Sequence, residues 1–575
     1  MITGIPVIDL FAGPGGLGDG FASAGFDVVL SCEMDSTACE TLTIRKFFHL
    51  FEAGKVPEEY YQFCRGELSC EELEELFPTE FREARLRVLN VQLGDKSRRV
   101  EVHQRINESL NKTGKDTNFV LVGGPPCQAY SLAGRSRRIG LGKNHTRDKM
   151  NRRVSLEELP DGARELLQER TEKFYSDPKH RLYLEYLEII AVHRPAVFVM
   201  ENVKGITSAK RSGHGTKAEL IFEKITQDLR APGKAVTEEL PSDIKSLFGF
   251  IDDTRYRLVS ITEQEVNDLL GQPIADPRGF IARCEDFGVP QARHRVFIIG
   301  IREDLNGRPD TLRKSDKPVT VRDMLFKLPK LRSGLSKEED TSSNWAAVIA
   351  RECRQRLEND ISDRLQLSEL LSKIKKEAGK LTRGSDFYGC SEASLRPGKQ
   401  APEVLRWISD PRLNGVINHQ SRSHMSSDLA RYLFCSAYAL SSNSKSSPKL
   451  EDWPAGKLLP NHQNVSEYVN KDGIRRVIAE TNSDRFKVQV WDKPATTITS
   501  HISKDGHYYI HPDPVQCRSL TVREAARLQT FPDNYFFAGG RTAQYHQVGN
   551  AVPPYFAKQI AESIRAFLTT DIAGD

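Results

Sequence analysis

The sequence predicts an α/β protein in which residues 5–300 form a doubly wound, largely parallel sheet. Short runs of β-branched and other apolar residues recur at residues 6–11, 28–31, 119–122, 196–200 and 295–300, as strands buried on both faces require. Helical patterns such as residues 182–192 separate these runs. Strands that alternate with helices are typical of a sheet covered by helices on both faces.

Composition narrows the class of protein. The chain of 575 residues has room for about three or four domains, or for two large ones. Lys and Arg number 82 and Asp and Glu number 78, so the net charge of +4 excludes a histone-like polycation and an acidic solvating chain. No apolar run reaches the ~18 residues of a membrane span, and residues 1–6 lack the features of a secretory signal. We therefore expect a globular protein that contacts no membrane.

The ten cysteines are scattered along the chain and none forms a C-x-x-C pair. Their spacing argues against a zinc ribbon and against a disulfide scaffold. His419 and His424 have no cysteine or acidic partner at a suitable spacing, so no metal site is predicted. A reducing, cytoplasmic setting is expected.

The chain divides into three zones. Residues 302–515 are polar, contain a low-complexity patch at 441–448 and show weak strand signals except near 495–499. Residues 519–568 recover helical periodicity, with apolar side chains at Ala557, Ile560, Ala561 and Ile564. We predict a first domain at 1–301, a second, mixed and irregular domain at 302–515, and a C-terminal segment at 516–575.

A glycine-rich loop follows the first predicted strand. Gly13, Gly15 and Gly18 fit the pattern G-x-G-x-x-G, in which glycines let the backbone turn tightly and approach a ligand. Glu33 ends the next strand, where such folds place an acid on a ribose hydroxyl. The loop permits a dinucleotide, S-adenosylmethionine or a generic glycine turn.

A cysteine is presented after a later strand. Residues 123–131 read Gly-Gly-Pro-Pro-Cys-Gln-Ala-Tyr-Ser, directly after the predicted strand 119–122. Ligand sites of open α/β sheets lie at this carboxyl edge, and a thiolate is a strong nucleophile once its pKa is lowered. We interpret Cys127 as a nucleophile and the other nine cysteines as small buried residues.

Charged side chains follow two further strands. Glu201 comes directly after the strand 196–200 and can act as a general acid, bond a ring nitrogen or cap a helix. Alternation places Gln291, Arg293 and Arg295 on one face. Two guanidinium groups there suit a carbonyl oxygen or a phosphate, or else mark a solvated strand start.

In combination these motifs resemble the cytosine-5 DNA methyltransferase family. Asp-Leu-Phe-Ala-Gly-x-Gly-Gly, Pro-Pro-Cys-Gln, Glu-Asn-Val and Gln-x-Arg-x-Arg occur in the family's order, followed by matching blocks at residues 520–532 and 547–554. Residues 302–515 correspond only in position, as the family's variable target-recognition domain. The resemblance implies a Rossmann-like catalytic domain to which residues 516–575 return.

The resemblance implies a chemical mechanism as well. The Cys127 thiolate would add to carbon 6 of cytosine, so that carbon 5 can take the methyl group of S-adenosyl-L-methionine. Glu201 would hold ring nitrogen 3, and Arg295, helped by Arg293, would hold the carbonyl oxygen, where negative charge develops. The base would have to leave the duplex to reach these groups.

By the same resemblance, residues from both ends of the chain would bind the cofactor. They are Phe11, Gly13 and Gly15 in the loop, Glu33 on the ribose, Met34 against the adenine, Pro125, and Asn550 and Val552 closing the pocket.

Three stretches depart from the family pattern. The acid that contacts the adenine amine has no clear match between residues 86 and 107, where Asp95 is the candidate. Residues 45–87 look like an insertion, whose acidic run 71–75 we interpret as a solvated helix face. Residues 135–153 contain eight Lys or Arg and one acid, a local charge of +7. These residues suit a loop that closes over phosphates. The alternative, for the part after Gly142, is an insertion that has no role.

The expected partner is double-stranded DNA, bound by one copy of the chain. Residues 302–515 offer arginines for phosphate or guanine contacts at 383, 396, 412, 422 and 431. We expect a prokaryotic modification enzyme, cytoplasmic and associated with the nucleoid, that acts alone or beside a cognate restriction or defence protein.

Three other readings remain open at this point. An RNA cytosine methyltransferase would share the fold, but such relatives carry a much smaller domain between the blocks. A nicotinamide-dependent oxidoreductase would use the glycine loop and Glu33 but leaves Cys127 and the arginines unexplained. A non-catalytic DNA-binding module would have been free to lose Cys127, Glu201 or Arg295.

Overall fold

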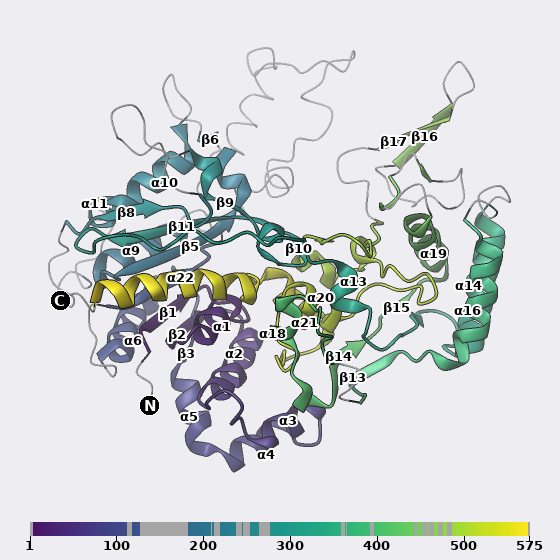
Figure 1. Cartoon of the computed structure of the whole chain (residues 1–575), viewed down its shortest axis with the longest axis horizontal. Coiled ribbons are helices and arrows are strands. Elements are labelled where there is room, and N and C mark those ends of the chain that lie inside the picture. Colours follow the sequence, from purple (N-terminus) through teal and green to yellow (C-terminus); the bar gives the residue numbers. More distant parts are fainter. Residues whose placement is uncertain are drawn as a thin grey trace.

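Figure 1 shows the computed structural model of the chain. The structure describes residues 4–111, 118–126, 182–208, 210–211, 219–236, 244, 253–263, 276–357, 363, 365–391, 396–441, 446–449, 452–453, 458, 465–469, 475–479 and 486–572. Cys127 and the basic segment 135–153 lie outside the described residues.

A mixed sheet organises the first half of the chain, with strand order β3-β2-β1-β4-β5-β11-β8 and β9 paired to β11. The parallel strands are β1 (Pro6–Leu10), β2 (Asp27–Glu33), β3 (Val88–Asn90), β4 (Val120–Gly123) and β5 (Val197–Val203). Strand β11 (His294–Arg302) is antiparallel to each of its neighbours β5, β8 (Tyr256–Val259) and β9 (Ile281–Arg283), so β8 and β9 run in the same direction as β5. The order reverses between β1 and β4, so the predicted doubly wound α/β class is confirmed. The strand predicted at 295–300 is the antiparallel one: β11 lies between β5 and β8 and runs in the opposite direction to both.

Helices cover both faces of this sheet, and alternate strand residues point into two core layers. Ile8, Leu121 and Phe198 belong to one layer, with α6 (Arg99–Asn111), α9 (Leu182–His193), α10 (Ile221–Arg230) and α11 (Pro232–Val236). Val7 and Val199 belong to the other layer, with α1 (Gly16–Ser23) and α22 (Pro554–Ile572). The period of two along each strand produces this division.

Helix α22 brings the end of the sequence back to its beginning. Ala557, Ile560, Ala561 and Ile564 are fully buried in the layer that contains α1. A Cβ at Gly20 would lie 2.5 Å from the Ala557 Cβ and 2.6 Å from the Lys558 nitrogen. Glycine is therefore the residue that lets the two helices approach this closely.

Three helices of the predicted insertion follow α2 (Ser36–His49): α3 (Glu58–Arg65), α4 (Cys70–Leu76) and α5 (Pro78–Leu86). Phe47, Tyr60 and Phe81 form their shared core, which also contains Leu413 and Ile417 of the second zone. In the acidic run, Leu73 is buried while Glu71, Glu72 and Glu75 are exposed.

Residues 302–515 form helices and several two-stranded sheets. The helices are α13 (Val321–Leu325), α14 (Ser342–Arg356), α16 (Leu367–Glu377), α18 (Glu403–Ile408) and α19 (Ser426–Leu440). Strand pairs join β12 (Gly334–Leu335) to β15 (Ser423–His424), β13 (Gly384–Gly389) to β14 (Gly415–Gln420), and β16 (Val465–Val469) to β17 (Arg475–Ala479). Figure 1 shows α14, α16 and α19 at the end of the molecule away from the large sheet.

Late segments return to the first half before α22 begins. Strand β18 (Ala495–Thr496) pairs with β10 (Gln291–Ala292), just ahead of β11. Helices α20 (Val522–Leu528) and α21 (Arg541–Asn550) follow. None of the helices in the described ranges is long and apolar enough to cross a membrane.

We predict that Gly20→Ala lowers the melting temperature by several degrees, because the added methyl group overlaps α22 and overpacking costs about 1–3 kcal/mol. Gly379→Ala provides the control, since a Cβ there meets nothing within 4 Å. Thermal unfolding followed by circular dichroism compares the two variants. Equal melting temperatures would contradict the close packing of α1 against α22.

Candidate active site

The glycine loop lies at the carboxyl end of β1, beside the point where the strand order reverses. Phe11, Gly13 and Gly15 have φ angles of +55°, +56° and +95°, so three left-handed residues turn the loop. The Gly13 N–H donates to Glu33 Oε2 at 2.8 Å, and the Asp35 N–H donates to Glu33 Oε1 at 2.9 Å. Glu33 thus holds the loop through one oxygen and the start of α2 through the other.

The side of the loop next to Glu33 and Met34 is open. A Cβ at Gly13 would meet nothing within 4 Å, and the Met34 side chain is 64% exposed beside Glu33. Asn90, at the end of β3, donates to the Glu33 and Met34 carbonyl oxygens at 3.1 and 3.2 Å. An acceptor carboxylate, an exposed thioether and a turn free of side chains fit an adenosine group.

Asp95 takes another role in the structure. Its Oδ1 accepts from the Ser97 N–H at 3.0 Å and so caps the short helix η1 (Lys96–Arg98). Asn90, rather than Asp95, occupies the end of β3. The sequence carried no signal for Asn90, because the expected residue type at this position was an acid.

Glu201 lies directly against the loop that leads to Cys127. A Cβ at Gly124 would lie 2.9 Å from Glu201 Oε2. The neighbouring Asn202 donates to the Pro125 carbonyl oxygen at 3.2 Å, and Pro125 is buried. Strand β5 therefore anchors the backbone at Pro125 and presents a carboxylate beside it.

The two arginines occupy different surroundings. Arg295 Nε pairs with Glu201 Oε1 at 3.0 Å, and both side chains keep some exposure, at 16% and 14%. Arg293 is buried and donates to the Ile498 carbonyl oxygen at 2.7 Å. Burial, followed by the charge of Arg295, lowers the pKa of Arg293 to about 9. Arg295 therefore faces the edge of the sheet, and Arg293 supports the segment that follows β18.

Two buried glutamines join this arginine strand to the C-terminal segment. Gln291 donates to the Leu528 carbonyl at 2.9 Å and to Gln529 Oε1, and it accepts from the Ile498 N–H at 3.0 Å. Gln529 donates to the carbonyl oxygens of Val548 and Ala551 at 2.6 and 3.1 Å. The network holds the backbone on either side of Asn550, next to Val552.

Of the two predicted closing residues, Val552 lies beside α1. The Val552 side chain is buried in the core layer that contains α1, and its carbonyl oxygen lies where a Cβ of Gly16 would be. Asn550 is exposed and contacts His546 at 3.1 Å. The structure thus brings Val552 to the start of α1, directly after the glycine loop.

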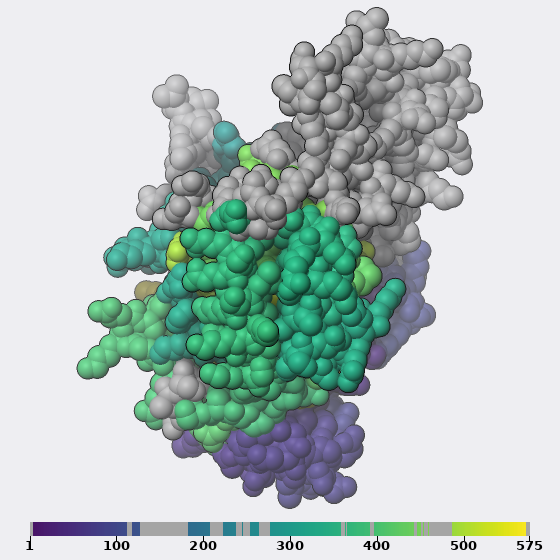
Figure 2. Space-filling model, turned by 90° about the vertical axis from the view of Figure 1, so that its right-hand side faces the viewer, coloured from purple at the N-terminus to yellow at the C-terminus, as the bar shows by residue number. Residues whose placement is uncertain are grey.

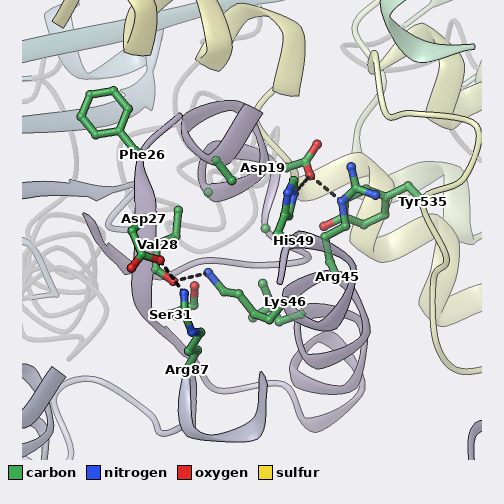
Figure 3. Close-up of a pocket in the computed structure, with 14 residues that line it drawn as sticks. Asp19, Phe26, Asp27, Val28, Ser31, Arg45, Lys46, His49, Arg87 and Tyr535 are labelled. Atoms are coloured by element: carbon green, nitrogen blue, oxygen red, sulfur yellow. Dashed lines mark hydrogen bonds and ion pairs between the residues drawn. The ribbon is translucent and has the colours of Figure 1, made fainter. Parts of the chain in front are cut away.

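A polar cavity of about 80 Å³ lies beneath the loop, between α1, α2 and β2 (Figure 3). Asp19 on α1 pairs with Arg45 at 2.5 Å and His49 at 2.7 Å. Burial opposes ionisation of Asp19, but Arg45 and then His49 lower its pKa to about 2. Above the cavity, the Tyr535 hydroxyl donates to the Pro14 carbonyl oxygen. Ionic and phenolic contacts therefore fix the underside of the loop.

Histidine and arginine side chains of the second zone contact other parts of the fold. His419 bonds Thr521 and the Pro329 carbonyl at 3.0 and 2.9 Å. Within the described ranges, no group of three or more His, Cys, Asp or Glu side chains could hold a metal ion. Arg422 and Arg431 are buried and donate to backbone carbonyls, so they support the fold rather than an outer surface.

Comparisons with known proteins agree with this geometry. The family model described as C-5 cytosine-specific DNA methylase matches residues 5–58, 168–237 and 280–566. These ranges include the glycine loop, Glu201, the arginine strand and α22, but neither residues 59–86 of the insertion nor Cys127.

Two relatives match along almost the whole chain. The Type II methyltransferase M.Bpa9945I of Bacillus paralicheniformis is 30% identical over 577 residues, which cover 97% of this chain and 98% of the relative. The Type II methyltransferase M.AgeI of Thalassovita gelatinovora is 22% identical and covers 98% of this chain and 99% of its own. The chain therefore belongs to the C-5 cytosine-specific DNA methylase family and is a DNA cytosine-5-methyltransferase.

Proposed function

We propose that the protein transfers a methyl group from S-adenosyl-L-methionine to carbon 5 of a cytosine that is flipped out of a specific duplex DNA sequence. The observation that carries this proposal is the Glu201–Arg295 pair beside Gly124 and Pro125, two residues ahead of Cys127. A carboxylic acid and a guanidinium side by side match the ring nitrogen and the carbonyl oxygen of one cytosine edge.

Each of these groups has a defined task in the proposed reaction. The Cys127 thiolate forms a bond to carbon 6, the 5,6 double bond opens, and its electron pair moves to carbon 5. Glu201 donates a proton to ring nitrogen 3, and Arg295 stabilises charge on the carbonyl oxygen. Carbon 5 would then take the methyl group, with S-adenosyl-L-homocysteine as the leaving group. A base removes the carbon 5 proton, the thiolate leaves carbon 6, and the proton on ring nitrogen 3 returns to Glu201, which restores the aromatic ring.

The first and last parts of the chain would together hold the cofactor. S-adenosyl-L-methionine supplies an electrophilic methyl group on a sulfonium centre. Glu33 would accept from the ribose hydroxyls while it orients the loop, and Met34 would pack on the adenine. Phe11, Gly13, Gly15 and Pro125 would line the remaining surface, with Asn550 and Val552 at the side formed by the C-terminal segment.

We propose that the biological role is DNA modification beside a cognate restriction or defence protein. The names of both relatives, Type II methyltransferases from bacteria, support this role. A single chain would act on duplex DNA in the cytoplasm, near the nucleoid, since one chain carries the catalytic residues and the recognition zone.

We predict that Cys127→Ala abolishes methylation and leaves cofactor binding within about twofold, because the thiol contacts the base and not the cofactor. Base-resolution methylome sequencing of DNA from a methylation-free host, expressing either form, reads the first result. Calorimetric titration with S-adenosylmethionine reads the second. Methylated DNA from the variant would contradict the assigned nucleophile, and unmodified DNA with the unsubstituted chain would favour an RNA substrate.

We predict that Glu33→Gln weakens S-adenosylmethionine binding by about tenfold or more, because the amide retains one acceptor oxygen where the carboxylate has two. A lost hydrogen bond to a charged group is worth about 1.5–3 kcal/mol. The exposed Glu40 on α2 gives the matched control Glu40→Gln. Titration calorimetry of both variants makes the comparison, and equal dissociation constants would remove Glu33 from the proposed cofactor site.

A further inference from the structure

A chain of buried polar contacts connects α1, which follows the cofactor loop, to the second zone. Asp19 on α1 pairs with Arg45 on α2 at 2.5 Å. Arg45 Nη1 donates to Asn534 Oδ1 at 3.0 Å. Asn534 Nδ2 in turn donates to Asp410 Oδ2 at 2.6 Å. Three side-chain contacts therefore connect parts of the sequence that are hundreds of residues apart.

The first half of this chain of contacts is rigidly held. Asp19, Arg45 and Asn534 are 3%, 6% and 6% exposed. The Arg45 guanidinium lies over the rings of Phe48 and Tyr535, at 4.1 and 4.7 Å from their centroids. Figure 3 shows Asp19 between His49 and Arg45, with Tyr535 beyond. Each of these groups has one defined orientation, as a positioning device requires.

The second half is held by the insertion. The Tyr61 hydroxyl of α3 donates to Asp410 Oδ2 at 2.7 Å, and the Tyr60 hydroxyl donates to the Asn534 carbonyl oxygen at 2.9 Å. Asp410 Oδ1 caps η8 (Pro411–Leu413) by accepting from the Arg412 N–H at 3.1 Å. Figure 2 shows the purple insertion directly beneath the green residues of the second zone. The contacts at Asn534 and Asp410 therefore form a junction of three regions: the insertion, residues 302–515 and the C-terminal segment.

We propose that Asn534 is a positioning residue that holds the recognition zone, through Asp410, in a fixed place relative to the cofactor-loop helix. The inference rests on the proposed function, in which residues 302–515 bind DNA and Glu201 and Arg295 receive the base. Residues 302–515 and the Glu201–Arg295 pair must engage the same duplex, so an error in the angle between them misplaces the base. A recognition zone at the wrong angle cannot make all its contacts with the duplex while the base is in place, so more DNA is needed for half-maximal rate and the KM for DNA rises.

The chemistry of an amide explains why this position needs asparagine. The amide oxygen accepts a hydrogen bond from the Arg45 guanidinium, and the amide nitrogen donates one to the Asp410 carboxylate. A carboxylate at 534 would still accept from Arg45 but would face the Asp410 carboxylate at hydrogen-bond distance. In the double variant, the amide at position 410 donates to the carboxylate at position 534, so the hydrogen bond is restored with donor and acceptor reversed. The second hydrogen of that amide can be donated to the Tyr61 oxygen.

The experiment compares Asn534→Asp, Asp410→Asn and the double variant with the unsubstituted chain. Methyl incorporation is measured against the concentration of a duplex that carries the site found by methylome sequencing. For Asn534→Asp we expect the KM for DNA to rise about tenfold, equivalent to about 1.4 kcal/mol. The dissociation constant for S-adenosylmethionine should stay within about twofold, and the double variant should recover the KM to within about threefold.

A destabilised control separates positioning from stability alone. Tyr256→Phe removes a buried hydroxyl that donates to the Pro195 carbonyl at 3.0 Å, in β8 and away from the junction. We expect a lower melting temperature and an unchanged KM for DNA in this variant. If Asn534→Asp behaves in the same way, or if the double variant fails to recover the KM, the positioning role is wrong.

The outcomes also distinguish this inference from the proposed function. An unsubstituted chain that methylates no DNA would refute the proposed function. An active chain whose KM is indifferent to Asn534→Asp would refute the inference alone. If Asn534→Asp yields no folded protein, Asp410→Ala removes the acceptor without repulsion and should raise the same KM, again with normal cofactor binding.

Discussion

The close packing of α1 against the C-terminal segment is the constraint on which the rest of the catalytic half depends. Gly16 and Gly20 have no side chain because the Val552 carbonyl and the Ala557 methyl occupy that space. This contact buries α22 against the sheet and places Val552 at the start of α1, directly after the glycine loop. Gln529 then fixes the backbone before Val552, and its partner Gln291 lies in β10, just ahead of Arg293 and of β11, which contains Arg295.

Helix α20 contacts residues 302–515 through apolar packing and through Arg527, which donates to the Met324 carbonyl oxygen at 3.0 Å. All of its residues from Val522 to Leu528 are buried. Arg518 forms two hydrogen bonds to Glu524, both at 2.6 Å, and Arg527 pairs with Asp533 at 2.7 Å. Burial opposes ionisation of Glu524, yet the charge of Arg518 lowers its pKa well below the usual range. Buried ion pairs add little net stability, but loss of one partner costs about 3–5 kcal/mol. These pairs therefore hold the C-terminal segment around α20 in one geometry.

The sequence predicted the sheet and its edge better than the contacts between distant segments. Apolar runs reveal strands and motifs reveal the ends of strands, so Glu201 and Arg295 were placed at one edge, and the structure pairs them. Asn534 carries no such pattern: its partner Arg45 lies 489 residues earlier. Gln529 and its partner Gln291 are 238 residues apart. A motif marks Gln291 and Gln529 as notable residues, but neither a motif nor a periodicity says which remote side chain each one meets, so only the fold reveals these contacts. Asp95, the candidate for the adenine contact, caps a short helix in the structure. Helix capping and ligand binding favour the same residue types, so the sequence alone does not separate the two roles.

The return of residues 547–568 onto α1 has a consequence for the order of events during synthesis. The glycine loop and Glu33 leave the ribosome first, yet the hydroxyl that holds Pro14 belongs to a residue made 521 positions later. Until α22 emerges, one core layer lacks the apolar side chains that cover α1 and the sheet. A nascent chain that ends before α22 therefore carries the glycine loop and Glu33 of the proposed cofactor site without the wall that closes the core behind α1.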